Sequence, residues 1–171
     1  MFQVNDLVVF GTHGICKIKA IGSLNMSSAD EDRLYYTLKP LYETQQSAVY
    51  TPVDNLKAPI RAACTREEAL EIIDRIPEIE TVWVLDERQR EGKYKEIMLK
   101  NDCIGWLQII KTLYLKRQKR LAEGKKSTSK DDLYFKLAED LLYGELASAL
   151  EMDREAVKDI IAVRVNADEN K

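Results

Sequence analysis

The chain has 171 residues, of which 45% are hydrophobic and 32% charged, and its formal net charge is −3. This composition is typical of a soluble protein with one domain or two small ones, and no apolar run reaches the length of about 18 residues that spans a membrane. The start of the chain lacks the basic residues and the long apolar stretch of a signal peptide. We therefore expect a cytoplasmic protein without membrane association.

The cysteines and the single histidine do not form a recognisable ligand pattern. Cys16, Cys64 and Cys103 are an odd number at wide spacing, which argues against a disulfide framework and favours a reducing compartment. His13 lies close to Cys16 in sequence, but no second ligand pair follows. We therefore expect structural roles for these residues, with no metal ion and no cofactor.

The first 60 residues have the pattern of short β-strands. Residues 15–21 alternate apolar and polar side chains, and the later segments are rich in β-branched and aromatic residues. The candidate strands are residues 2–10, 15–21, 34–38 and 48–53. Turn signals separate these segments, so the sequence predicts a small antiparallel barrel.

The hydrophobic period becomes helical from residue 65 onward. Thr65 and Glu68 have the spacing of a capping box at the start of the first helix, and Pro77 is expected to stop it. Asp102 and Thr128 are candidate caps for later helices. Further helices are predicted at residues 86–100, 102–123 and 128–150, followed by a short helix from Asp153 and a frayed tail after Val165.

A β region followed by an all-helical region predicts the α+β class with two separate domains. We place a small antiparallel Tudor-like or SH3-like barrel at residues 1–60 and a helical domain at residues 65–171.

Positive charge is concentrated in one stretch of the helical region. Residues 111–130 carry eight basic groups and one acidic group, a local charge of +7, although the whole chain is acidic. A local patch sets the field that a phosphate backbone meets, and lysines and arginines release counterions on contact with it. The alternative is that these cations complement the negative end of a helix dipole. The candidate DNA-binding cations are Lys111, Lys116, Arg117, Lys119, Arg120, Lys125, Lys126 and Lys130, together with Arg88 and Arg90.

Two tryptophans invite different interpretations. Trp83 lies in the connector before residue 86, where a large apolar side chain can act as a minor-groove wedge. We favour simple packing for it, because large apolar residues are usually buried. Trp106 lies on the apolar face of a predicted helix and is expected in the core.

The sequence offers no catalytic constellation. His13 has no nearby nucleophile pattern, and no glycine-rich phosphate loop is present. The paired carboxylates, Glu67-Glu68 and Asp131-Asp132, suit helix N-termini better than acid-base chemistry. We therefore expect that the protein is not an enzyme.

Several motifs, taken in order, resemble one known family. The opening Phe2-x-Val4-x-Asp6-x-Val8-Val9-Phe10 is followed by His13-Gly14. Three helical segments follow, in the order and at the spacing of that family's helical domain. These segments are Tyr94-Lys95-Glu96, residues 109–114 and residues 136–146. The chain resembles the CarD family of bacterial transcription regulators, also called CdnL-like proteins, whose N-terminal module is shared with the transcription-repair coupling factor. The resemblance covers nearly the whole chain and depends on the joint order of the motifs.

The resemblance implies a barrel that binds the RNA polymerase β subunit and a helical domain that contacts the upstream edge of the melted promoter. It implies stabilisation of the open complex with little sequence specificity. The polymerase contact of the family, often an arginine, corresponds here to Tyr50, with Val49 and Thr51 beside it. The wedge tryptophan of the family corresponds to a position near Glu87, and Trp83 four residues earlier can substitute for it.

The leading hypothesis is therefore a monomeric transcription regulator tethered to polymerase that clamps promoter DNA. The main alternative is a protein adaptor on polymerase whose basic patch meets an acidic partner. The third is an RNA-binding barrel, which is weaker because the β region has no recognisable cluster of exposed aromatic and basic residues. Affinity for DNA that falls with salt distinguishes the first hypothesis from the second.

Overall fold

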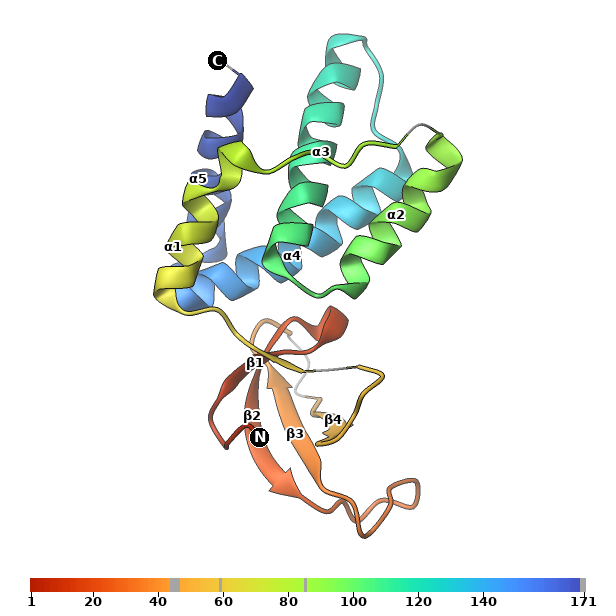
Figure 1. The fold of residues 1–171 in the computed structure, drawn as a ribbon, viewed down its shortest axis with the longest axis vertical. Coiled ribbons are helices and arrows are strands. Elements are labelled where there is room, and N and C mark those ends of the chain that lie inside the picture. Colours follow the sequence, from red (N-terminus) through yellow and green to blue (C-terminus); the bar gives the residue numbers. More distant parts are fainter. Residues whose placement is uncertain (44–46, 59, 85, 170–171) are drawn as a thin grey trace. The chain divides into compact units, whose positions relative to one another are not determined.

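The computed structural model describes residues 1–43, 47–58, 60–84 and 86–169 (Figure 1). The chain divides into two compact units, Met1–Ala63 and Cys64–Lys171. The first is a curled antiparallel sheet and the second is helical, so the predicted α+β class with a Tudor-like β domain and a helical domain is confirmed. The division falls between the predicted domains 1–60 and 65–171.

The sheet of the first unit has the strand order β4-β3-β2-β1-β5, with every neighbouring pair antiparallel. A register shift between Ile18 and Ala20 in β2 is a bulge, which increases the local twist and helps the sheet to curl. The strands are β1 (Leu7–Val9), β2 (Ile15–Gly22), β3 (Tyr35–Pro40), β4 (Val49–Pro52) and β5 (Arg61–Ala62).

The first strand is shorter than predicted, and β5 was not predicted. Asn5 has a φ of 77° and Asp6 N–H donates to Gln3 O at 3.1 Å, so a turn occupies the residues before Leu7. The two residues of β5 pair with β1, which no local periodicity can indicate. A 3-10 turn, Gly11–His13, links β1 to β2 and ends at Gly14 with a φ of 66°.

The core of the first unit consists of alternate residues on the inner face of the sheet. These are Val8, Cys16, Ile18, Tyr36 and Leu38. Burial raises the pKa of the Cys16 thiol to about 12, so this cysteine stays protonated and unreactive at neutral pH.

The second unit contains α1 (Arg66–Asp74), a 3-10 turn η2 (Ile76–Glu78), α2 (Glu87–Leu99), α3 (Cys103–Ala122), α4 (Ser129–Leu150) and α5 (Arg154–Glu169). The caps occur as predicted. Thr65 and Glu68 form the capping box, and Asp102 and Thr128 accept hydrogen bonds from the first turns of their helices. Asp86, which was not predicted as a cap, does the same for α2. Pro77 lies in η2, after α1 has ended.

The last helix corrects a prediction. It is 16 residues long and continues past Val165, where we expected a short helix and a frayed tail. Val157, Ile161 and Val165 are buried at a spacing of four residues, and α5 packs against α4. This apolar stripe gives the C-terminal segment enough burial to stay helical.

The helical core is centred on α3 and α4, which α2 and α1 also contact. Trp106, Leu142 and Leu146 are fully buried, so the core position predicted for Trp106 is confirmed. Within the described residues, none of the helices is both long and apolar enough to cross a membrane.

Candidate interaction surfaces

Strand β4 is an outer strand of the sheet, and some of its main-chain N–H and C=O groups point away from β3. Val53 N–H donates to Leu34 O across the β3–β4 pair at 3.0 Å. Hydrogen-bonded and non-hydrogen-bonded residues alternate along an antiparallel pair, so Tyr50 occupies a non-bonded position opposite Thr37. Its N–H and C=O therefore point away from β3. Such an edge is able to add a strand from a partner.

The three residues predicted to contact polymerase have different environments on this strand. Tyr50 is 44% exposed, and Val49 is half-buried against the core of the sheet. Thr51 is buried, its hydroxyl accepts a hydrogen bond from Asn55 Nδ2 at 3.0 Å, and its main chain faces β3. Of the three, only Tyr50 therefore presents both its ring and its main chain to a partner. The side chain of Thr51 lies inside the domain, so it is not presented at the surface.

Beside β4 lies an apolar hollow that the sequence did not reveal. Its volume is about 380 Å³, and its lining includes Phe2, Tyr36, Pro52 and Leu56. Leu56 is 95% exposed, in a turn with the polar neighbours Asn55 and Lys57. A lone leucine in a polar turn is the signal that sequence reasoning missed, because single exposed leucines are common on protein surfaces.

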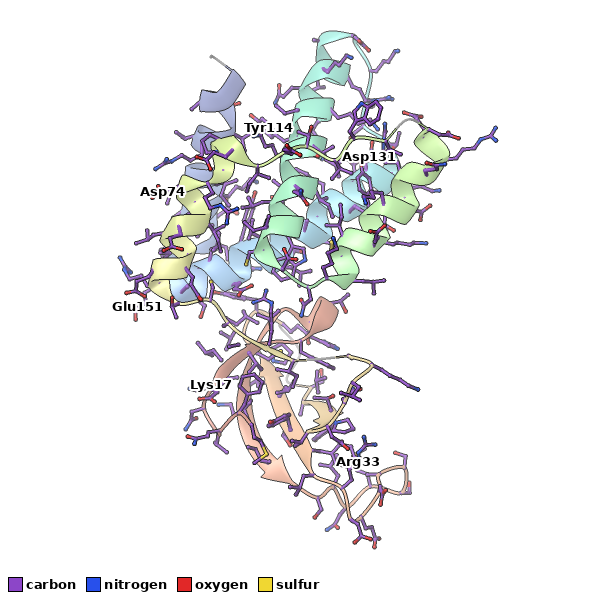
Figure 2. The ribbon with its side chains drawn as sticks, viewed as in Figure 1. Lys17, Arg33, Asp74, Tyr114, Asp131 and Glu151 are labelled. Atoms are coloured by element: carbon purple, nitrogen blue, oxygen red, sulfur yellow. The ribbon has the colours of Figure 1, made fainter. Side chains whose placement is uncertain are left out.

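The basic stretch around the end of α3 is partly neutralised by carboxylates of the same unit. Seven of its cations lie outside the core, and four of them have an ionic partner. Lys116 pairs with Asp131, Arg117 with Asp132 at 3.0 Å, Lys125 with Glu123 at 3.7 Å, and Lys130 with Glu91 at 2.8 Å. Figure 2 shows Asp131 among the helices.

Two of these pairs are built into the structure more firmly than the others. Asp131 is buried, and the guanidinium of Arg117 also lies 4.4 Å from the ring centre of Phe135. Lys125 and Lys130 are exposed, and solvent screens such exposed ion pairs so that they add little to stability. Lys125 and Lys130 can therefore exchange their carboxylates for phosphates at little cost, whereas Lys116 cannot.

Three cations in this stretch have no carboxylate partner among the described residues. Lys119 and Lys126 are exposed, and Arg120 is half-buried and donates from Nε to Lys126 O at 2.8 Å. At the start of α2, Arg88 is exposed, while Arg90 pairs with Glu87 at 3.2 Å. The positive surface that the structure presents is therefore smaller than the sequence predicted.

Lys111 lies inside the helical unit and is not part of that surface. It is 5% exposed, and its ammonium donates hydrogen bonds to main-chain carbonyls of the segment that follows α1. The prediction that it contacts DNA placed it on the wrong face of the helix, because a lysine among apolar neighbours was counted only by its charge.

Trp83 is 77% exposed, so the packing that we favoured for it is wrong. It lies between η2 and α2, in a connector without helix or strand. An exposed tryptophan offers a large rigid apolar surface to a partner. The structure thus supports the accessibility that a wedge or a stacking contact needs.

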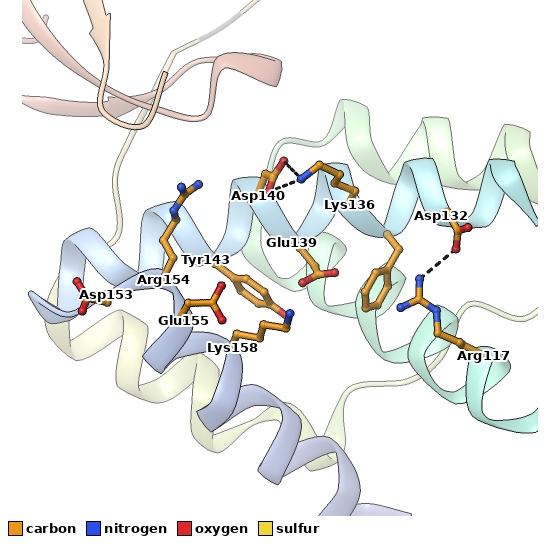
Figure 3. A pocket seen from close by; sticks show the side chains of 11 residues that line it. Arg117, Asp132, Lys136, Glu139, Asp140, Tyr143, Asp153, Arg154, Glu155 and Lys158 are labelled. Carbon is orange, nitrogen blue, oxygen red and sulfur yellow. Dashed lines mark hydrogen bonds and ion pairs between the residues drawn. The ribbon is translucent and has the colours of Figure 1, made fainter. Parts of the chain in front are cut away.

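A groove between α3, α4 and α5 is lined mainly by charged side chains (Figure 3). Its volume is about 720 Å³. Glu139 faces it, and burial raises the pKa of this carboxyl above its ordinary value, although Lys158 and Arg117 oppose the shift. Burial also raises the pKa of the neighbouring Tyr143. The folded state therefore prefers a protonated Glu139 more strongly than the unfolded chain does.

This preference predicts that Glu139→Gln stabilises the protein at pH 7. Because the folded-state pKa is raised, the stability associated with this group is lost as the pH rises through that pKa. The gain from the substitution is below about 1 kcal/mol, because the group is only half-buried, and it disappears below about pH 4. Denaturant unfolding between pH 4 and pH 8 measures it. The matched control, Asp140→Asn on the next residue, should give no such gain at pH 7.

One group of two buried side chains and one half-buried side chain has the composition of a metal site. Ligand atoms of Cys64, Cys103 and Glu145 lie within 4.8 Å of one another. In the structure, Glu145 accepts hydrogen bonds from Cys64 N–H at 2.9 Å and from the Cys103 thiol at 3.1 Å. The carboxylate thus joins the start of the helical unit to α3 and α4, a role that the wide sequence spacing concealed.

The sheet unit matches a known domain model. Residues 2–64 match the model described as the CarD-like/TRCF RID domain, a family that interacts with RNA polymerase. A search of curated proteins finds no significant match to the chain. The family match supports a transcription-related role that involves RNA polymerase. The N-terminal unit of this chain, residues 2–64, therefore belongs to the family of CarD-like/TRCF RID domains.

Proposed function

We propose that the protein is a transcription regulator that binds the RNA polymerase β subunit through its sheet unit and contacts promoter DNA through its helical unit. The observation that carries the proposal is the match of residues 2–64 to the RID domain family. The outward main chain of Tyr50 on β4 supports strand addition as the mode of binding. The apolar hollow beside β4 offers room for a side chain of the added strand.

The helical unit supplies the DNA contacts in this proposal. The exposed Trp83 and the unpaired cations Lys119, Arg120 and Lys126 are the groups that support it. Binding to polymerase raises the local concentration of these groups beside the promoter, so that weak DNA contacts suffice. Contacts made only with the melted promoter favour the open complex, because a ligand shifts an equilibrium by its differential affinity for the two states.

The contacts expected here recognise the backbone and the shape of DNA rather than base sequence. The groups that support them are cations and one exposed aromatic side chain, which provide charge and apolar surface. We propose accordingly that the protein is a cytoplasmic monomer with no enzymatic activity.

The adaptor alternative has one observation in its favour. Four cations of the basic stretch already have carboxylate partners, which lowers its local charge. In that alternative the cations that remain meet an acidic protein on the transcription complex. The contacts between these cations and the acidic protein would then persist when DNA is absent.

Reversing the unpaired cations tests the proposal. The variant Lys119→Glu, Arg120→Glu, Lys126→Glu should bind polymerase normally but should lose the protein's ability to slow open-complex collapse. Its affinity for forked DNA should depend less on salt, with a slope lower by about 0.9 for each phosphate contact removed. Promoter-complex lifetimes and fluorescence anisotropy over a salt series measure both effects.

The matched control reverses three exposed lysines elsewhere in the helical unit, Lys93, Lys100 and Lys158. This control changes the net charge by the same amount, so it should retain most of the stabilisation. Full stabilisation by the Lys119, Arg120 and Lys126 variant would remove the DNA surface from the proposal. Loss of polymerase contact by the same variant would favour the adaptor.

A further inference from the structure

A buried lysine on α3 holds the connector that leads to Trp83. The ammonium of Lys111 donates to the carbonyl oxygens of Ile76 at 3.2 Å, Pro77 at 3.1 Å and Ile79 at 2.9 Å. These carbonyls belong to η2 and to its end, and Ile76 O also accepts from Ile79 N–H at 3.2 Å. One cation therefore binds three main-chain carbonyls of the same segment at once.

The next residue of α3 holds the same connector closer to the tryptophan. Thr112 Oγ1 accepts a hydrogen bond from Val82 N–H at 2.7 Å, and the hydroxyl donates to Gln108 O at 2.6 Å. The hydroxyl group is thus fixed by its own helix while it fixes the main chain one residue before Trp83. Figure 1 shows the connector crossing α3.

We infer that Lys111 and Thr112 are positioning residues, which fix the connector so that the exposed Trp83 is presented in one place. This inference deepens the proposed function and depends on it for the role of Trp83 in binding DNA. A side chain that is 77% exposed makes few contacts of its own. Its position must therefore come from the main chain that carries it, and the four hydrogen bonds from α3 supply that constraint. A preorganised aromatic group binds with a smaller loss of conformational entropy than a mobile one.

The substitution Thr112→Val tests the inference, because valine keeps the shape of threonine and removes the acceptor for Val82 N–H. We expect faster hydrogen exchange at the Val82 amide and lower fluorescence anisotropy of Trp83. Trp106 is buried, so iodide quenching separates the signal of Trp83 from that of the second tryptophan. Affinity for forked DNA should fall by up to roughly tenfold, the range of one hydrogen bond. Thr112→Ser keeps the hydroxyl and should restore all three measurements.

A second pair of variants separates positioning from direct charge contact. Lys111→Met should loosen Trp83 and leave the salt dependence of DNA binding unchanged. Lys100→Met, at an exposed lysine just after α2, removes the same charge and should not change the mobility of Trp83. A salt slope lowered by about 0.9 in Lys111→Met would show a direct phosphate contact and would overturn the inference.

The outcomes for the inference and for the proposed function can be told apart. Unchanged Val82 exchange and unchanged Trp83 anisotropy in Thr112→Val would overturn the positioning role. Increased mobility of Trp83 supports that role whatever happens to DNA binding. If Trp83→Ala and Thr112→Val both bind forked DNA as the unsubstituted chain does, positioning stands and the DNA role of Trp83 fails.

Discussion

Replacing Tyr50 by proline should strongly weaken binding to the polymerase β subunit while leaving the sheet unit folded. The N–H of Tyr50 points away from β3, so its loss removes no hydrogen bond within the domain. Proline is tolerated on an outer strand at such a position but cannot donate to an added strand. The loss of one main-chain bond and the clash of the ring should lower affinity by at least roughly tenfold. Surface plasmon resonance with the β subunit measures it.

Two matched substitutions isolate the cause of the expected loss. Tyr50→Thr keeps the N–H and the preference for strand, so it reports the contribution of the ring alone. Val49→Pro removes an N–H that faces β3, because Val49 is a hydrogen-bonded neighbour of Leu38, and should destabilise the domain. If Tyr50→Pro binds as tightly as Tyr50→Thr, then β4 does not pair with a strand of the partner.

Local signals in the sequence were sufficient for the starts of several helices, but not for the end of the last one. Thr65, Asp102 and Thr128 cap their helices as predicted, because a cap acts on main-chain N–H groups two or three residues away. The change from β to helical periodicity likewise gave the α+β class, and the match of residues 2–64 confirmed the family of the sheet unit. Features that depend only on residues close in sequence, such as caps and hydrophobic periodicity, could therefore be predicted.

The environment of the charged residues was not readable, because distant segments determine it. Lys111 was counted with the DNA-facing cations, although its acceptors lie 32 to 35 residues earlier in the chain. Asp131 and Asp132 were assigned to the start of a helix, yet they also pair with Lys116 and Arg117, 15 residues earlier. Charge counted along the chain therefore overestimated the positive surface.

The two tryptophans also show that only locally determined burial could be predicted. Trp106 lies in a helix whose apolar face is evident from its period, so its burial was predictable. Trp83 lies in a connector without period, and its exposure follows from where Lys111 and Thr112 hold the main chain. The general preference of large apolar residues for burial therefore gave the wrong prediction for Trp83, the residue most relevant to the candidate site.

Glu145→Ala should be the most destabilising substitution of a charged residue in the helical unit. The carboxylate is fully buried and accepts from Cys64 N–H at 2.9 Å and from the Cys103 thiol at 3.1 Å. Truncation leaves a buried N–H without its acceptor and opens a cavity between α3 and α4. Losses of this kind cost about 3 kcal/mol or more, which corresponds to a fall in melting temperature of more than roughly 10 °C for a unit of this size.

Calorimetry on three variants distinguishes the hydrogen bonds from the charge. Glu145→Gln keeps the shape and one acceptor oxygen, so it should lose clearly less stability than Glu145→Ala. Asp159→Ala removes an exposed carboxylate from α5 and should change the melting temperature little. Equal losses for Glu145→Gln and Glu145→Ala would mean that the negative charge itself is required, because the hydrogen-bonding capacity that remains in glutamine would then contribute nothing. A loss in Glu145→Ala no larger than in Asp159→Ala would contradict the structural role of this buried carboxylate.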